Sequence, residues 1–252
     1  MMLMENNFVI ITGANGGIGS GLVKVYKLAG YKIIGIDKTP PNSGDIIDFF
    51  MQIDLVSLLY DDIRAKDFFI EINKMIGNYT LDSLVNNAAI QILNPINKLS
   101  ISDFTLSLNT NTIIPFFLIK NLYQLLKKSK NGSVINISSI HSKLTKPNFI
   151  AYATSKSALI GLTKAMSIEF GNDIRVNSIS PAAISTQMLK EGFVGKPEQY
   201  KKLNKMHPVG RIGEPLEVAE LSLFLSSGKA QFINGANFEI DGGISSRLYD
   251  PE

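Results

Sequence analysis

The sequence has no cysteine and only two histidines, His141 and His207, among its 252 residues. The absence of cysteine excludes disulfides and cysteine-ligated metals, and two histidines are too few for a histidine-rich metal site. We therefore expect no metal centre in this protein.

Long apolar segments and charge of one sign are also missing. The N-terminal stretch MMLMENNF lacks the basic segment and apolar core of a signal peptide, and the apolar run at residues 113–119 is too short to span a bilayer. The 25 basic and 22 acidic residues are interspersed and give a net charge of +3, without the basic stripe of a nucleic-acid surface. We expect a soluble cytoplasmic protein that binds neither membranes nor nucleic acid.

The sequence does contain an alternation of strands and helices. Apolar β-branched runs at residues 8–11, 31–36, 81–85, 134–137 and 174–179 predict buried strands, and helical periodicity follows most of them. This alternation is typical of an α/β fold, a doubly wound parallel sheet with right-handed crossovers, here of about seven strands. The hydrophobic content of 45% is ample for one large domain that spans residues 1–252.

Two connections in this pattern are unusual. Residues 38–49 contain Pro40, Pro41 and Gly44 and predict a loop with little room for a crossover helix. Ser100 and Asp103 predict a capping box for a long helix through about Lys128, interrupted near Pro115.

The stretch from Thr12 to Gly19, TGANGGIG, follows the first strand and precedes a helix. Glycines there allow a sharp turn and the close approach of a pyrophosphate, while N–H groups at the helix start face the anion. Asp37 ends the second strand 18 residues after Gly19, near where a dinucleotide-binding fold places its ribose carboxylate. The alternative for Asp37 is a turn residue before Pro40.

Tyr152 and Lys156 lie one turn apart at the start of a predicted helix, after a strand that ends at Ser139. A cation within ~4–6 Å can lower the phenol pKa of about 10 by roughly 1–3 units, which favours proton exchange. The spacing alone is weak evidence, because Tyr123 and Lys127 share it. That second pair has no serine at a strand end upstream, and we interpret it as core plus solvated helix face.

The order and spacing of these motifs resemble the short-chain dehydrogenase/reductase family from Thr12 to Gly243. The matching segments are Thr12-Gly13-x-x-x-Gly17-x-Gly19, Asn86-Asn87-Ala88, Asn111 with Pro115-Phe116, Ser139 with Tyr152-x-x-x-Lys156, Pro181 with Thr186, Gly210-Arg211 and Asp241-Gly242-Gly243. Ala89 and Ala182 replace glycines that are common in the family, which puts the local backbone geometry in question.

The resemblance implies a single Rossmann-type domain that transfers hydride between a nicotinamide cofactor and an alcohol or ketone. It implies that Tyr152 is the general acid/base and that Lys156 lowers the Tyr152 pKa and holds the nicotinamide ribose. Ser139 is expected to orient the substrate oxygen, and Asn111 to hold a water that links Lys156 to solvent.

The resemblance also implies a cofactor site. Its expected residues are Gly13, Asn15, Gly17, Ile18, Gly19, Asp37, Asp54, Leu55, Asn87, Ala88, Tyr152, Lys156, Ile184 and Thr186. We predict that NAD is preferred over NADP, because the Asp37 carboxylate accepts a hydrogen bond from a ribose 2′-hydroxyl and repels a 2′-phosphate. By resemblance, together with the apolar run at residues 113–117 and the tail at residues 245–252, we expect a homo-oligomer, a tetramer or a dimer.

Residues 187–207 are polar and weakly periodic, a profile typical of a mobile lid over a cleft. Gln91, His141, Lys143 and Lys146 are expected to border the substrate pocket with this lid, and the three basic groups indicate an anionic substrate. Three alternatives remain open: a sugar epimerase or dehydratase that uses the same tyrosine and lysine, a catalytically silent dinucleotide-binding protein, and a methyltransferase. Intact Ser139, Tyr152 and Lys156 favour the dehydrogenase.

Overall fold

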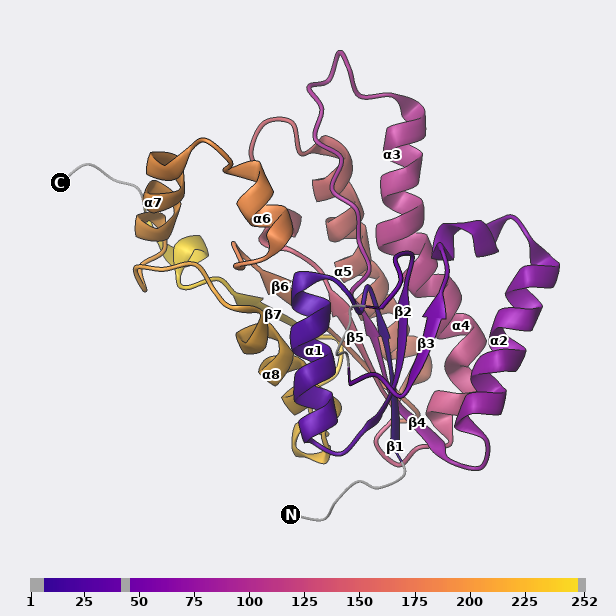
Figure 1. Ribbon diagram of the computed structural model, residues 1–252. Coiled ribbons are helices and arrows are strands. Elements are labelled where there is room, and N and C mark those ends of the chain that lie inside the picture. Colours follow the sequence, from indigo (N-terminus) through magenta and orange to yellow (C-terminus); the bar gives the residue numbers. More distant parts are fainter. Residues whose placement is uncertain (1–6, 42–45, 249–252) are drawn as a thin grey trace.

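The computed structural model describes residues 7–41 and 46–248. Its centre is a seven-stranded parallel sheet with the order β3-β2-β1-β4-β5-β6-β7 (Figure 1). The strands are β1 (Asn7–Thr12), β2 (Lys32–Asp37), β3 (Phe49–Gln52), β4 (Thr80–Asn86), β5 (Ser133–Ile137), β6 (Arg175–Pro181) and β7 (Asn237–Ile240). The winding reverses between β1 and β4, which is where ligands bind in open α/β sheets.

Helices cover both faces of the sheet (Figure 1). They are α1 (Gly17–Leu28), α2 (Asp62–Ile76), α3 (Ile101–Leu108), α4 (Ile114–Lys127), α5 (Ile150–Phe170), α6 (Gln187–Gly192), α7 (Pro197–Met206) and α8 (Pro215–Ser226). Alternating side chains of β1 divide between two apolar clusters: Phe8 and Ile10 pack toward α2 and α4, whereas Val9 and Ile11 pack toward α1 and α8. Both faces of β1 are therefore buried, as its uninterrupted apolar sequence predicts.

The long helix predicted from Ser100 is divided into three parts. The capping box between Ser100 and Asp103 is present and begins α3. A π-helical turn, Asn109–Ile113, then separates α3 from α4, with the Ile114 N–H donating to the Asn109 carbonyl. This turn confirms the interruption predicted near Pro115. Pro115 has no N–H to donate to the preceding turn, so a regular α-helix cannot continue through it with all its hydrogen bonds.

The sequence of residues 187–207 is weakly periodic and predicts a mobile lid without regular structure. In the structure this segment forms two helices, α6 and α7. The Thr186 hydroxyl accepts the Leu189 N–H and so caps α6, and Pro197 stands in the first turn of α7. No side chain of α7 is fully buried, but Tyr200, Leu203 and Met206 recur at a spacing of three among polar residues, a short apolar stripe that the sequence interpretation overlooked.

The short connection between β2 and β3 is confirmed, since the described part of it contains no helix. Asp48 supports this connection: its carboxylate accepts the Ile33 N–H at 2.8 Å and pairs with Lys27 at 2.6 Å. Across the described ranges, no helix combines the length and the apolar character needed to cross a membrane.

Candidate active site

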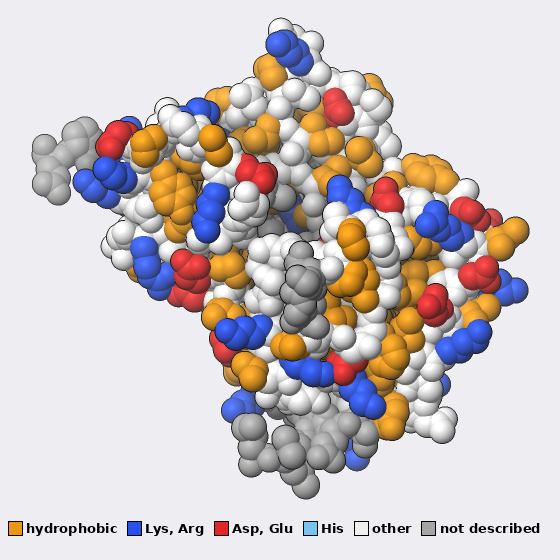
Figure 2. Space-filling model, viewed as in Figure 1, with side chains coloured by type: hydrophobic (Ala, Val, Ile, Leu, Met, Phe, Trp, Pro, Cys, Tyr) orange, Lys and Arg blue, Asp and Glu red, His pale blue; other side chains and the backbone are white. Residues whose placement is uncertain are grey.

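The carboxyl ends of the central strands open into a cleft of about 1060 Å³. Figure 2 shows the surface hollowed near the middle of the molecule. Among the residues predicted from the sequence, those that line the cleft are Gly13, Asn15, Gly17, Ile18, Asp37, Asp54, Leu55, Asn87, Ala88, Ser139, Tyr152, Lys156, Ile184 and Thr186. Gly19 and Asn111 lie outside its wall.

The glycine turn packs tightly against the end of β4. Gly13 has a φ of 64°, and a Cβ there would stand 2.9 Å from the Ala88 Cα. A Cβ on Gly19 would collide with the Gly13 carbonyl oxygen, although Gly19 does not line the cleft. Gly19 therefore acts by allowing the turn to fold back on itself.

Thr12 and Asn87 join this turn to β4. The Thr12 hydroxyl accepts the N–H groups of Asn87 and Ala88, both at 3.0 Å. The Asn87 side-chain amide donates to the carbonyls of Thr12 and Gly13, both at 3.0 Å. The Asn87 side chain thus fixes the shape of the turn from within the cleft wall.

Asp37 receives hydrogen bonds on both carboxylate oxygens at the end of β2. Its Oδ2 accepts the Asn15 N–H at 3.1 Å, and its Oδ1 accepts the N–H and hydroxyl of Thr39 at 3.1 and 3.0 Å. The two sequence interpretations of Asp37 therefore hold together, since the residue organises a turn and also lines the cleft.

Two features of the turn fit a dinucleotide. Helix α1 is preceded by Gly16 as its N-cap and has no side-chain cap, which leaves N–H groups of its first turn available to a phosphate. The Asn15 Oδ1 is buried and has no hydrogen-bond partner within the described ranges. An uncapped helix start and an unsatisfied acceptor suit a ligand that has both anionic and hydroxyl groups.

Ser139, Tyr152 and Lys156 meet at the other end of the cleft, where β5 ends and α5 begins. The Lys156 Nζ donates to the Ile137 carbonyl at 2.7 Å and lies 5.8 Å from the centre of the Tyr152 ring. Burial lowers the pKa of Lys156 to about 7. A hydroxyl, a phenol and a buried amine thus line one small region of the wall.

The pKa of Tyr152 does not follow the sequence expectation. Burial raises this pKa above its ordinary value, and the Ser139 hydroxyl opposes the shift. The expected lowering by Lys156 is not found, because Lys156 is itself buried and its ammonium is directed to the Ile137 carbonyl. The environment of Tyr152 therefore favours the protonated phenol.

Asn111 lies in the π-helical turn, and its side chain is hydrogen-bonded to other parts of the chain. Its Nδ2 donates to the Ile90 carbonyl and to the Ser155 Oγ, and its Oδ1 accepts the Ile90 N–H, all at 2.9 Å. The side chain thereby ties the loop after β4 to the residue that precedes Lys156. Its role as a holder of water for Lys156 stays a prediction.

Tyr123 and Lys127, the second pair with this spacing, both contact the carboxylate of Asp173. The Tyr123 hydroxyl donates to the Asp173 Oδ2 at 2.7 Å, and Lys127 forms an ion pair with the same carboxylate at 2.8 Å. Neither residue lines the cleft. The interpretation of this pair as structural is confirmed.

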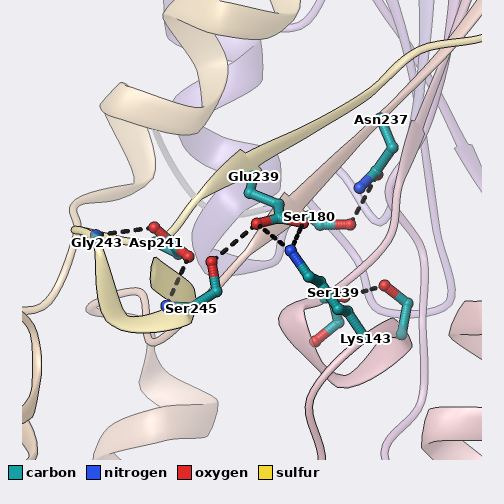
Figure 3. A network of polar contacts seen from close by, with 9 residues as sticks. Ser139, Lys143, Ser180, Asn237, Glu239, Asp241, Gly243 and Ser245 are labelled. Carbon is teal, nitrogen blue, oxygen red and sulfur yellow. Dashed lines mark hydrogen bonds and ion pairs between the residues drawn. The ribbon is translucent and has the colours of Figure 1, made fainter. Parts of the chain in front are cut away.

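The basic groups near the pocket contribute less charge than the sequence suggests. Lys143 pairs with Glu239 of β7 at 2.9 Å, and Glu239 also accepts the Ser245 hydroxyl (Figure 3). His141 stacks on Phe149 with ring centres 4.0 Å apart, and burial, with a smaller effect of Lys146, lowers its pKa to about 4.

Lys143 is thus neutralised outside the cleft wall, and His141 is uncharged at neutral pH. Lys146 is the one of the three basic groups that brings a positive charge to the cleft. The indication of an anionic substrate is correspondingly weak.

Ala89 and Ala182 fit their positions without strain. Asn148, with a φ of 75°, is the one non-glycine residue of the described ranges that has a positive φ. Alanine is therefore compatible with the backbone where the family commonly has glycine.

Sequence reasoning missed the apolar wall of the cleft and one polar residue within it. Phe149 and Ile244 were missed altogether, whereas Leu203, Met206 and His207 lie in the 187–207 segment that was expected to border the pocket but were not singled out within it. Leu203 and Met206 lie three residues apart on α7, a helical spacing that could have indicated them. The rarity of histidine in this chain was the one signal that could have drawn attention to His207.

The doubly wound sheet, the glycine turn and the Ser-Tyr-Lys group define a dinucleotide-dependent oxidoreductase. A family model described as enoyl-(acyl carrier protein) reductase matches residues 13–245. The chain belongs to the short-chain dehydrogenase/reductase family. It transfers hydride between a nicotinamide cofactor and an alcohol or carbonyl substrate.

Similar proteins match over almost the whole chain. Carbonyl reductase (NADPH) 2 of Sus scrofa is 30% identical, with 95% of this chain and 98% of the relative covered. The structure of Thermoplasma acidophilum aldohexose dehydrogenase superposes with a TM-score of 0.90 at 29% identity, covering 98% of this chain and 97% of the other. A 4-hydroxyisoleucine dehydrogenase complexed with NADH gives a TM-score of 0.84 at 32% identity, covering 96% and 100%.

Proposed function

We propose that this protein is an NAD-preferring dehydrogenase or reductase in which Tyr152 transfers the proton and Ser139 and Lys156 support it. The observation that carries the proposal is the presence of these three side chains in the same cleft as the glycine turn and Asp37. We also infer that residues 1–252 form a single domain, with α6 and α7 as the substrate lid.

The cleft provides a place for each part of the cofactor. The glycine turn and the start of α1 would hold the pyrophosphate, Asp37 the adenine ribose, and Asp54 and Leu55 the adenine. Ile184 and Thr186 would border the nicotinamide, with Lys156 at its ribose. The bound nicotinamide supplies or accepts the hydride.

The chain's own residues handle the proton. In reduction the Tyr152 hydroxyl donates its proton to the carbonyl oxygen of the substrate, and in oxidation the phenolate takes the proton from the alcohol. The Ser139 hydroxyl donates a hydrogen bond to the same oxygen, which holds it and stabilises negative charge that develops there. A protonated Lys156 would place a positive charge 5.8 Å from the centre of the Tyr152 ring, which would oppose the effect of burial on the Tyr152 pKa once the phenolate forms.

The preference for NAD rests on Asp37. Its carboxylate lines the cleft and forms no ion pair with any described residue. A 2′-phosphate would meet this negative charge, whereas a 2′-hydroxyl can donate a hydrogen bond to it. The similar proteins differ in cofactor, since one name specifies NADPH and one structure contains NADH.

An activity screen tests the proposal. Pairs of secondary alcohols and their ketones, including sugars, cyclic diols, hydroxy acids and steroids, are supplied with each of the four nicotinamide cofactors, and absorbance at the reduced nicotinamide band is followed. We expect turnover with NAD or NADH for at least one pair. Turnover with NADP or NADPH alone would contradict the proposed preference, and purely non-redox conversion of sugars would favour an epimerase.

A further inference from the structure

His207 has an unsatisfied buried nitrogen at the edge of the substrate cleft. The residue follows α7 and lines the cleft, although only 2% of its surface is exposed. Its Nδ1 lies 2.9 Å from the Leu203 carbonyl oxygen, so Nδ1 carries a proton and donates it. In the neutral imidazole Nε2 then has a free lone pair, and this atom has no hydrogen-bond partner within the described ranges. Such an acceptor destabilises the fold unless a ligand or water satisfies it.

The imidazole is held in place by the chain around it. The Gly210 N–H donates to the His207 carbonyl at 2.8 Å, and the Val209 N–H donates to the Gly242 carbonyl at 3.2 Å. A Cβ on Gly242 would stand 3.4 Å from the His207 Cβ, so the turn after β7 packs directly against this residue. His207 is therefore a fixed acceptor.

Asp241 is the charged group on that turn, and its carboxylate is occupied by its own loop. One oxygen accepts the Gly243 N–H at 2.8 Å and the other the Ser245 N–H at 3.1 Å (Figure 3). Asp241 consequently gives the His207 Nε2 no hydrogen bond, and as an acceptor it could not donate one.

The cleft that His207 lines also has an apolar wall. Side chains that line it from the lid, from the loop after β5 and from the segment after β7 are Leu144, Leu189, Phe193, Leu203, Met206 and Ile244. The polar side chains Thr145 and Gln199 also line the cleft, but both are exposed and can serve water. A donor group of a ligand would thus find a fixed acceptor in His207, and the apolar part of the ligand would find apolar walls in the same cleft.

We propose that His207 determines substrate specificity by accepting a hydrogen bond from a second hydroxyl group of the substrate. This inference rests on the proposed function, because it places the reacting alcohol or carbonyl at Ser139 and Tyr152 of the same cleft. The substrate class is then a secondary alcohol or ketone that has an apolar body and a further hydroxyl near the reacting carbon. A site built to bind a hydroxyl rejects an analogue without it, because the buried acceptor is left unsatisfied.

Nitrogen NMR can test the hydrogen bond directly, because the chain has only two histidines. Protein labelled with 15N-histidine is saturated with NADH, so that added alcohols form dead-end complexes without turnover. Matched probes are then added: trans-cyclohexane-1,2-diol with cyclohexanol, butane-2,3-diol with butan-2-ol, and 1-phenylpropane-1,2-diol with 1-phenylpropan-1-ol. We expect at least one diol to move the His207 Nε2 resonance upfield, as a hydrogen-bonded lone pair does, while its partner alcohol and the His141 resonances show no such change.

Two variants connect the hydrogen bond to specificity. His207→Phe keeps a ring but removes the acceptor, whereas His207→Gln can return an acceptor near the Nε2 position. We expect the ratio of kcat/KM for diol over alcohol to fall at least ~10-fold in His207→Phe and to recover in part in His207→Gln. Cofactor titration of both variants checks that they fold, and their NADH affinity should match that of the wild type.

The outcomes separate this inference from the proposed function. Turnover of diols and alcohols with a ratio that His207→Phe leaves unchanged would overturn the role of His207 and leave the proposed function intact. A diol-specific shift of Nε2 without turnover of any probe would support the binding role and count against the reaction. If no diol shifts Nε2 at concentrations up to its solubility, a hydroxyl-binding role for His207 is wrong.

Discussion

At the scale of single residues, Asp37 joins a structural and a functional task. Its two oxygens hold the Asn15 and Thr39 backbone N–H groups, so the carboxylate is fixed in the cleft before any ligand arrives. Lys38 also lines the cleft and is the one cation that adjoins it in sequence. Selectivity between NAD and NADP thus depends on which of the two charges meets the ribose.

We expect the wild type to bind NADH at least ~10-fold more tightly than NADPH, a difference of about 1.4 kcal/mol. Asp37→Ala should remove most of this preference, because it removes the repulsion of the 2′-phosphate. Lys38→Ala should leave the preference in place. Fluorescence titration of both cofactors measures the ratios, and equal affinities in the wild type, or the same ratio in Asp37→Ala, would exclude Asp37 from the selectivity.

His141 provides a prediction about pH at the same scale. Burial against Phe149 lowers its pKa to about 4 in the folded protein, below the ordinary histidine value of 6.5. Between these two pH values the unfolded chain binds more protons, so the contribution of His141 to the free energy of unfolding increases as the pH rises from 4 to 6.5. Below pH 4 its destabilising effect is fully present, and above 6.5 it is absent.

The comparison of wild type with His141→Asn isolates this effect, because carboxylates titrate alike in both proteins. We expect the stability of the wild type relative to the variant, from denaturant unfolding, to decrease as the pH falls from 6.5 to 4. A difference that does not change with pH would mean that His141 has an ordinary pKa in the folded state.

At the scale of elements, the sequence predicts those parts whose pattern is set by burial in the sheet or by capping. The apolar run of β1 and the Ser100–Asp103 capping box are present as expected. Helices α6 and α7 were not predicted, because both are short and polar, and the apolar stripe of α7 consists of only Tyr200, Leu203 and Met206. The site residues of the glycine turn followed from spacing, whereas His207 enters the cleft only through the packing of the lid against the turn after β7.

The π-helical turn around Asn111 connects two elements of the site. Asn111→Ala would leave the Ile90 N–H and carbonyl and the Ser155 hydroxyl without this partner. We expect a loss of about 1–3 kcal/mol in the free energy of unfolding and a reduced kcat, since Ser155 precedes Lys156. Asn121→Ala is the matched control, because Asn121 donates to the Phe117 carbonyl on the exposed side of α4. Equal effects of the two substitutions on stability and kcat would contradict the positioning role of Asn111.

At the scale of the whole molecule, apolar side chains remain exposed on helices that flank the sheet. Ile113 and Phe116 of the turn and α4 are 40% and 43% exposed, and Ile168 of α5 is 83% exposed. Such surface is typical of contacts between subunits. The end of the tail that the sequence also suggests as a contact, residues 249–252, lies outside the described residues.

We expect a homo-oligomer, most simply a tetramer with symmetric contacts through α4 and α5. Light scattering at micromolar concentration should give a mass near four times 27.6 kDa. Phe116→Asp should reduce this mass, because it places a charge in the contact, whereas Asp62→Asn on α2 should not. A wild-type monomer at this concentration would contradict the prediction.

The proposed reaction depends on Tyr152 as the group that transfers the proton. The most direct measurement is the steady-state kcat of Tyr152→Phe and Tyr123→Phe with the first substrate pair that the activity screen identifies. Each variant removes one hydroxyl from a tyrosine that has a lysine four residues later, but only Tyr152 lines the cleft. We predict a loss of at least ~10²-fold for Tyr152→Phe, the lower end for general acid–base catalysis, and a nearly unchanged kcat for Tyr123→Phe. If the two variants lose the same amount of activity, or neither loses any, Tyr152 is not the proton donor and the proposed site is wrong.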